Sequence, residues 1–95
     1  MEYEWDPDKA KNNLKKHGIS FKAAMAALED PYRLEGPDPH ECEERTRVLC
    51  LYKGMTVLFV VTAEPEEGVC RIITARRAEP HERERYNQNR ALQQR

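Results

Sequence analysis

The sequence lacks the features that mark a membrane protein or a secreted protein. Its uninterrupted apolar runs, such as Val57 to Val61, are far shorter than the roughly 18 to 20 residues needed to span a bilayer. The first residues, MEYEWDPDK, have neither the basic flank nor the apolar stretch of a secretory signal. We therefore expect a protein that contacts no membrane and stays in the cytoplasm.

Cysteine is also scarce. Cys42, Cys50 and Cys70 form no CxxC pair and have no histidine at ligand spacing, so neither a disulfide framework nor a zinc knuckle is expected. Cys50 and Cys70 lie in apolar runs, which favours buried thiols. No GxSxG, Walker, HExxH or dinucleotide-binding glycine pattern occurs. The sequence therefore predicts no metal and no cofactor.

The 95 residues are enough for one modest core, because short chains bury a smaller share of their surface. No linker, repeat or low-complexity segment divides the chain. We therefore expect a single domain over residues 1–95.

The N-terminal part predicts a strand followed by a helical hairpin. Residues 1–5 alternate between acidic and large apolar side chains, which is the period of a half-buried strand. A helix over residues 7–17 begins after the acceptor Asp6 and ends at Gly18, which can adopt a left-handed conformation. A second helix over residues 21–28 follows at once. Helices joined so closely fold back on each other and share one apolar face.

The second half predicts a three-stranded antiparallel meander over residues 46–52, 55–63 and 69–75. Its middle strand is apolar on both faces and should therefore be central. The preceding residues 32–44 are rich in prolines and acids, which indicates a short strand at 32–34 and then an exposed loop.

A last helix is expected from Pro80 to about Gln94. It has few apolar residues, so it either docks through Tyr86 alone or binds a partner. The whole order predicts an α+β fold: an N-terminal strand, a helical hairpin packed on an antiparallel sheet, and a C-terminal helix.

Charge is segregated along the chain, although the net charge is only -1. Residues 71–95 hold seven Arg against three Glu, whereas residues 29–47 hold seven acids against three Arg. Arg71, Arg76 and Arg77 place cations at the end of the last strand, where planar guanidinium groups suit phosphate. A solvated, salt-bridged helix accounts for part of the same charge without any ligand.

These residue types could support metal-free RNA cleavage. That reaction needs a group that takes the 2′-hydroxyl proton, a cation beside the phosphorane, and a donor to the leaving 5′-oxygen. The arginines offer the cation, and Glu43, Glu44 or His17 could be the base. The spacing does not choose among them. Lys16 and His17 are also explained as cations that complement the C-terminal end of a helix dipole.

Three separated motifs resemble the BrnT family of type II toxin–antitoxin toxins. They are EYEWDPDKAKNNLKKHGISFKAA with a following EDP, then ERTRVL, and finally RIITARRAEPHERERY. They run in the right order from Tyr3 to about Tyr86. The resemblance implies a RelE-like fold and a ribonuclease that arrests translation. It also implies a BrnA-type antitoxin whose ribbon-helix-helix domain binds the operator, so this chain would meet DNA only through its partner in a hetero-oligomer.

The leading hypothesis is a metal-independent endoribonuclease toxin that a BrnA-type antitoxin neutralises. The residues predicted to be catalytic are Arg76 and Arg77 as phosphate ligands, Arg45 as a second cation and Glu44 as the base. The residues predicted to contact RNA are Lys16, His17 and Arg71. The residues predicted to contact the antitoxin are Arg83, Tyr86 and Arg90. The alternative is a non-catalytic binding module for a DNA-binding repressor, which the low pI of about 6.3 and the acidic loop favour.

Overall fold

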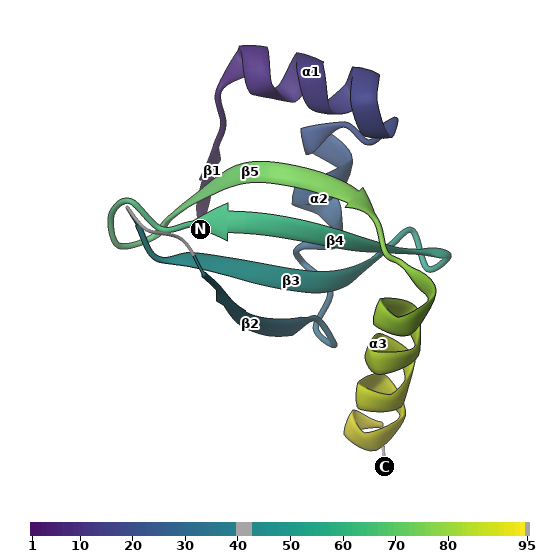
Figure 1. The fold of residues 1–95 in the computed structure, drawn as a ribbon. Coiled ribbons are helices and arrows are strands. Elements are labelled where there is room, and N and C mark those ends of the chain that lie inside the picture. Colours follow the sequence, from purple (N-terminus) through teal and green to yellow (C-terminus); the bar gives the residue numbers. More distant parts are fainter. Residues whose placement is uncertain (40–42, 95) are drawn as a thin grey trace.

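The chain forms one mixed sheet with two helices over one face and a third helix at the end of the other face (Figure 1). The computed structural model describes residues 1–39 and 43–94, so Cys42 lies outside the described residues. The elements are β1 (Glu2–Glu4), α1 (Pro7–His17), α2 (Phe21–Ala27), β2 (Leu34–Asp38), β3 (Arg45–Tyr52), β4 (Thr56–Ala63), β5 (Val69–Arg77) and α3 (Pro80–Gln93). No helix in the described ranges is both long and apolar enough to cross a bilayer.

The strands lie in the order β1-β5-β4-β3-β2. The predicted meander is confirmed, because β3, β4 and β5 pair antiparallel and the apolar strand β4 is central. The N-terminal strand is also confirmed, and it adds to β5 in parallel. β5 continues to Arg77, two residues beyond its predicted end. A register shift between Val61 and Thr62 interrupts its pairing with β4.

The predicted loop before the meander is wrong in part. The short strand expected at residues 32–34 begins only at Leu34 and continues as the edge strand β2, which pairs with β3 as far as Asp38 opposite Arg45. Pro37 is compatible with this place because an edge strand has a neighbour on one side only, so half of its backbone groups need no strand partner. The prediction failed because prolines and acids are local signals of a loop, whereas the pairing of these residues with β3 is a tertiary contact that local signals do not report.

The helical hairpin begins and ends close to its predicted caps. Asp6 accepts hydrogen bonds from the backbone N–H groups of Asp8 and Lys9 at the start of α1. Gly18 ends α1 with a φ of 72°, and Ser20 caps the start of α2. The hairpin covers one face of the sheet, as expected. The buried core there includes Phe21, Ala24, Ala27, Val48, Leu58, Val60 and Ile72.

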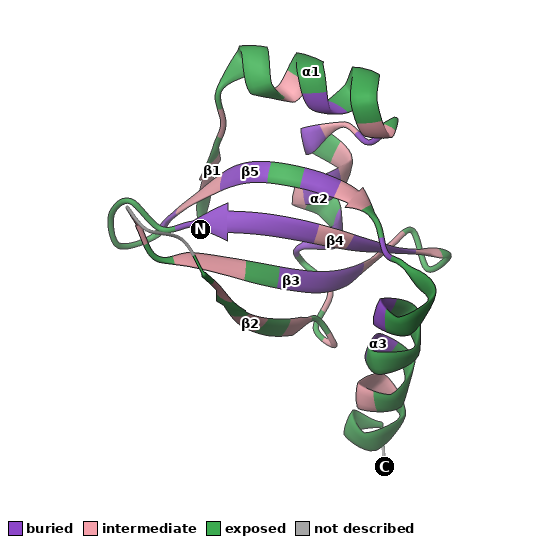
Figure 2. Ribbon diagram, in the orientation of Figure 1, coloured by how far each residue is buried: buried purple, intermediate pink, exposed green. Residues whose placement is uncertain are grey.

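α3 docks on the opposite face of the sheet through Tyr86, whose side chain is 1% exposed. It packs in a second core cluster with Leu49, Val57 and Ala78. The Tyr86 hydroxyl donates a hydrogen bond to Asp30, and burial together with this bond raises the pKa of Tyr86 to about 12. Docking of this helix through Tyr86 is therefore observed, with a second anchor at the buried Glu82, while the binding of a partner stays a prediction. Most of the remaining helix surface is exposed (Figure 2).

Candidate functional site

Within the described residues, the second half of β5 has a strand on one side only. β1 pairs with residues 69–71 alone, and α1 lies along the rest of that edge. The Asn13 amide donates a hydrogen bond to the Ala75 carbonyl at 2.8 Å and accepts one from the Ala75 N–H at 3.1 Å. It also donates to the Ile19 carbonyl at 3.0 Å. One buried side chain therefore ties α1 to β5 and satisfies backbone groups that a missing strand would otherwise bond.

Two adjoining hollows lie between α1 and β5, and they share Lys9 and Ile73. The first has a volume of about 410 Å³, and its further lining residues include Glu4, Trp5, Asp6 and Arg71. The second has a volume of about 290 Å³, and its further lining residues include Asn12, Lys16, His17, Arg45 and Thr74. We call the two hollows together the α1–β5 groove.

The α1–β5 groove brings together four residues that the sequence singled out: Lys16, His17, Arg45 and Arg71. Lys9, Lys16 and His17 share one face of α1 because seven or eight residues correspond to about two helical turns. Lys9 and Asn12 were not among the predicted site residues. The groove therefore collects cations from α1, β3 and β5, which are distant in sequence.

The charges of the groove are partly paired. Arg71 forms an ion pair with Glu4 at 2.8 Å, and Arg45 forms one with Glu43 at 2.9 Å. Within residues 1–39 and 43–94, the side chains of Lys16 and His17 form no ion pair. Glu44, the predicted base, lines a separate hollow of about 520 Å³ that also borders Arg45. The groove thus offers unpaired cations on its helical wall.

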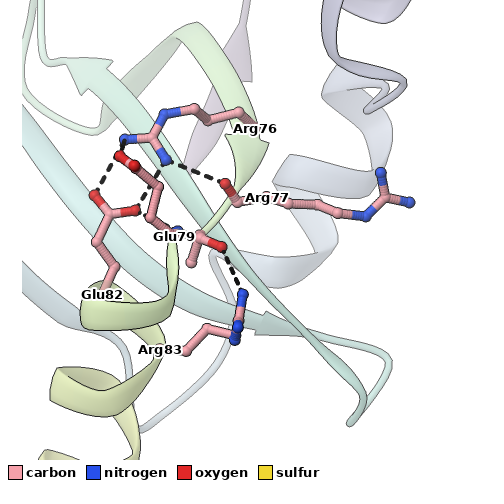
Figure 3. Close-up of polar contacts among 6 residues, drawn as sticks. Arg76, Arg77, Glu79, Glu82 and Arg83 are labelled. Atoms are coloured by element: carbon pink, nitrogen blue, oxygen red, sulfur yellow. Dashed lines mark hydrogen bonds and ion pairs between the residues drawn. The ribbon is translucent and has the colours of Figure 1, made fainter.

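Arg76 and Arg77 point to opposite faces of the sheet (Figure 3). The Arg76 guanidinium lies 4.1 Å from the centre of the Phe59 ring and binds both carboxylate oxygens of Glu82, at 2.9 and 3.1 Å. Arg77 points away from this cluster. The expected pair of phosphate ligands at one strand end is therefore separated, because successive side chains of a strand alternate between its faces.

The ion pair between Arg76 and Glu82 fixes the start of α3. The Glu82 carboxylate also accepts the Glu79 N–H at 2.7 Å, which completes a capping box. Burial raises the pKa of Glu82, but the Arg76 hydrogen bond, the Glu79 N–H and the Arg76 charge together lower this pKa below its ordinary value. The hydrogen bond to Glu82 in turn raises the pKa of Arg76.

Glu82→Gln is expected to lower the free energy of unfolding by about 1.5 to 3 kcal/mol at neutral pH, the usual range for hydrogen bonds to charged groups. Because the folded pKa of Glu82 is depressed, this stabilisation is complete above the unfolded pKa of about 4.3 and is lost as the pH falls through the folded value. Urea unfolding at pH 7 and pH 3 measures the difference. The control is Glu84→Gln, since Glu84 is exposed and accepts a hydrogen bond from exposed Gln88. A pH-independent difference for Glu82→Gln would contradict this account.

The prediction that the chain has no metal-ligand cluster needs a correction. Glu79, His81 and Glu82 at the start of α3 have ligand atoms within 4.8 Å of one another. Sequence spacing missed the cluster because the turn into α3 brings these side chains together. A metal ion there would compete with Arg76, because Arg76 binds both oxygens of Glu82.

The residues predicted to bind an antitoxin all make contacts inside the chain. Tyr86 is buried, as described above. Arg83 donates to the Ala78 carbonyl at 3.0 Å. Arg90 donates to the Tyr86 hydroxyl at 3.3 Å and lies 4.9 Å from the centre of the Tyr32 ring. Arg83 is exposed and Arg90 is half-buried, so a partner could reach these two arginines but not the ring of Tyr86.

Comparisons with known proteins agree with this architecture. The chain matches, over residues 5–82, the family model of the ribonuclease toxin BrnT of type II toxin–antitoxin systems. Its fold is similar to the crystal structure of the Brucella abortus ribonuclease toxin BrnT, with a TM-score of 0.63, 21% identity, and coverage of 83% of this chain and 97% of that chain. The comparison with curated proteins gives no match. The family match spans most of the chain, and the chain therefore belongs to the BrnT family of ribonuclease toxins of type II toxin–antitoxin systems.

Proposed function

We propose that this chain is an endoribonuclease that cleaves RNA without a metal ion, arrests translation, and is held inactive by an antitoxin. Family membership supports the general class. The observation that carries the proposal for this chain is the α1–β5 groove, where Lys9, Lys16 and His17 face a floor that includes Ile73. The acids Glu4 and Asp6 also line the groove, but Arg71 binds the first and the start of α1 engages the second.

The groove suits the backbone of a single RNA strand. Lys9 and Lys16 are separated by seven residues, so their side chains leave α1 at points about 10 Å apart along its axis. Arg45 offers a guanidinium between α1 and the sheet, where it can bind a phosphate in a forked geometry. Neutralising phosphates in this way supplies affinity that does not depend on sequence.

The proposed reaction is transfer within the RNA backbone. The 2′-hydroxyl oxygen forms a bond to the adjacent phosphorus, the bond from phosphorus to the 5′-oxygen breaks, and that oxygen takes up a proton. The His17 imidazole can accept and donate protons in these steps, while Arg45 can stabilise the additional negative charge of the phosphorane. Glu44 stays the alternative base, since it borders Arg45 from the neighbouring hollow. Arg77 offers an exposed phosphate ligand, whereas Arg76 can offer only the atoms that Glu82 leaves accessible.

The proposed partner is a BrnA-type antitoxin with a ribbon-helix-helix domain. The complex would be a hetero-oligomer that reaches operator DNA only through the antitoxin. It would act in the cytoplasm, where both its RNA substrate and its partner are found.

Chelation tests the metal independence of the reaction. Cleavage of single-stranded RNA by the purified chain is expected to be unchanged in EDTA, because the groove offers cationic side chains in place of a metal Lewis acid. The measurement is the single-turnover rate with and without chelator. Activity that disappears in EDTA and returns with a divalent ion would contradict the proposal and direct attention to Glu79, His81 and Glu82.

One observation favours a second function: the Arg76 guanidinium is already bound to both carboxylate oxygens of Glu82 within the chain. In that case the chain is a non-catalytic binding module that partners a DNA-binding repressor. The same assay separates the two functions. A chain that binds its antitoxin tightly but cleaves no RNA at any metal concentration would be the binding module.

A further inference from the structure

α1 has two unlike faces. One face carries Lys9, Lys16 and His17 into the α1–β5 groove. On another side of α1, a hollow of about 310 Å³ lies against α2 and the chain that enters α1, and we call it the hairpin groove. Its lining residues are Trp5, Ala10, Lys11, Leu14, Ser20, Phe21 and Lys22.

The hairpin groove has a rigid apolar floor and an uncovered apolar wall. Trp5 meets Phe21 edge to face, with ring centres 6.0 Å apart, and Phe21 belongs to the main core. Leu14 forms part of the wall and is 51% exposed. Asn13 is the buried residue of α1, and Ala10 is partly buried against the main core. About half of Leu14 is left uncovered within the described chain.

The rim of the hairpin groove is positively charged. Lys11 and Lys22 are exposed and line it, and no acidic residue is among its described lining residues. Within residues 1–39 and 43–94, neither lysine forms an ion pair. The complementary ligand is a peptide segment with a bulky apolar side chain flanked by carboxylates.

We propose that the hairpin groove is the docking site of the antitoxin and accepts an acidic segment with one apolar anchor against Trp5 and Leu14. The inference rests on the antitoxin partner named in the proposed function, but not on RNA cleavage. An α-helix with its side chains is about 10 to 12 Å wide. A segment anchored here would therefore have to cross only α1 to cover Lys9 and Lys16 in the α1–β5 groove.

The rival surface is α3, and the chain offers a matched pair of leucines to separate the two. Leu14 in the hairpin groove is 51% exposed, and Leu92 on α3 is 63% exposed. Leu14→Glu and Leu92→Glu are the same change at two exposed helical positions. Both variants should keep the melting temperature of the parent chain, because exposed positions away from the core tolerate polar substitution.

Isothermal titration with the purified product of the adjacent reading frame measures antitoxin affinity. Leu14→Glu should weaken binding by about 30-fold or more, because it removes an apolar contact and adds a charge that repels acids, while Leu92→Glu should change it by less than about 3-fold. Reversing the charge of the rim with Lys11→Glu and Lys22→Glu should weaken antitoxin binding by about 10-fold and reduce the salt dependence of this binding.

Unchanged affinity in a folded Leu14→Glu variant would overturn the proposal, as would a loss confined to Leu92→Glu. If the chain alone sediments as a dimer that Leu14→Glu converts to a monomer, the occupant is a second copy and the proposal is also overturned. RNA cleavage by Leu14→Glu should stay at the parent rate. If the parent chain cleaves no RNA but Leu14→Glu loses antitoxin binding, the ribonuclease proposal fails while this one stands.

Discussion

Replacing both Lys16 and Arg45 by alanine is expected to lower RNA cleavage by at least about 1,000-fold, because removing one preorganised donor to a developing oxyanion typically costs 10²- to 10³-fold. Cells that express the double variant without antitoxin should keep growing. Both side chains line the α1–β5 groove, and neither is a buried core residue. The measurements are single-turnover cleavage of single-stranded RNA and growth after induction.

The matched control is Lys11→Ala combined with Arg47→Ala. It removes the same charges from the same two elements, α1 and β3, but at positions outside the lining of the α1–β5 groove. The long-range attraction of RNA depends on net charge, so both double variants should lose some cleavage for this reason. This shared loss should be smaller than the loss caused by removing the two groove residues. Comparable cleavage by the two variants would show that the groove is not the reaction site. Thermal unfolding of each variant shows whether any loss comes from misfolding.

Tyr86→Ala is expected to lower the free energy of unfolding by about 3 to 5 kcal/mol, the usual cost of truncating a fully buried aromatic side chain. Such a loss is a large part of the roughly 5 to 15 kcal/mol that stabilises an ordinary domain. The phenol fills the second core cluster, and its hydroxyl bonds the Asp30 carboxylate, which also accepts the Leu51 N–H at 2.9 Å. Urea unfolding at pH 7 measures the change.

One further variant separates packing from hydrogen bonding at Tyr86, and a second serves as a control on the exposed part of α3. Tyr86→Phe keeps the ring and should cost only about 1 to 2 kcal/mol. Leu92→Ala, on the exposed part of α3, should change stability by less than about 0.5 kcal/mol. If Tyr86→Ala were as mild as Leu92→Ala, α3 would not be anchored as described.

The raised pKa of Tyr86 adds a pH dependence to the same prediction. Because the folded pKa lies above the unfolded one, the stabilisation is complete below the unfolded value and is lost as the pH rises toward about 12. The parent chain should therefore lose stability at alkaline pH more steeply than Tyr86→Phe does. Parallel alkaline unfolding curves would contradict the raised pKa of Tyr86.

Much of the fold could be predicted because its signals are local. Asp6, Gly18 and Ser20 cap the helices they were expected to cap, since each capping bond joins residues close in sequence. The continuous apolar pattern of β4 likewise predicted a central strand, because a strand with neighbours on both sides and cover on both faces has no polar face. The three separated motifs indicated the BrnT family, and the family match confirms it.

The sequence predicted individual residues of the candidate site but not their arrangement in space. The sequence singled out Lys16, His17, Arg45 and Arg71, but it did not show that they line one groove. It treated Arg76 and Arg77 as neighbours with one task, whereas strand alternation and the buried Glu82 separate them. Asn13 was missed as a site residue. Its only local hint is an asparagine in mid-helix, where this residue is an unfavourable helix former.

The sequence by itself determined where the helices and the central strands lie, with ends that differ from the structure by at most two residues, and which chemical groups the chain offers. Only the tertiary structure decided that residues 34–38 join the sheet, that α3 is held by Tyr86, and that Asn13 binds Ala75, 62 residues away. The physical reason is the range of the interactions. Capping and periodicity act over a few residues, whereas sheet edges, ion pairs and grooves depend on contacts between segments whose approach no local pattern specifies.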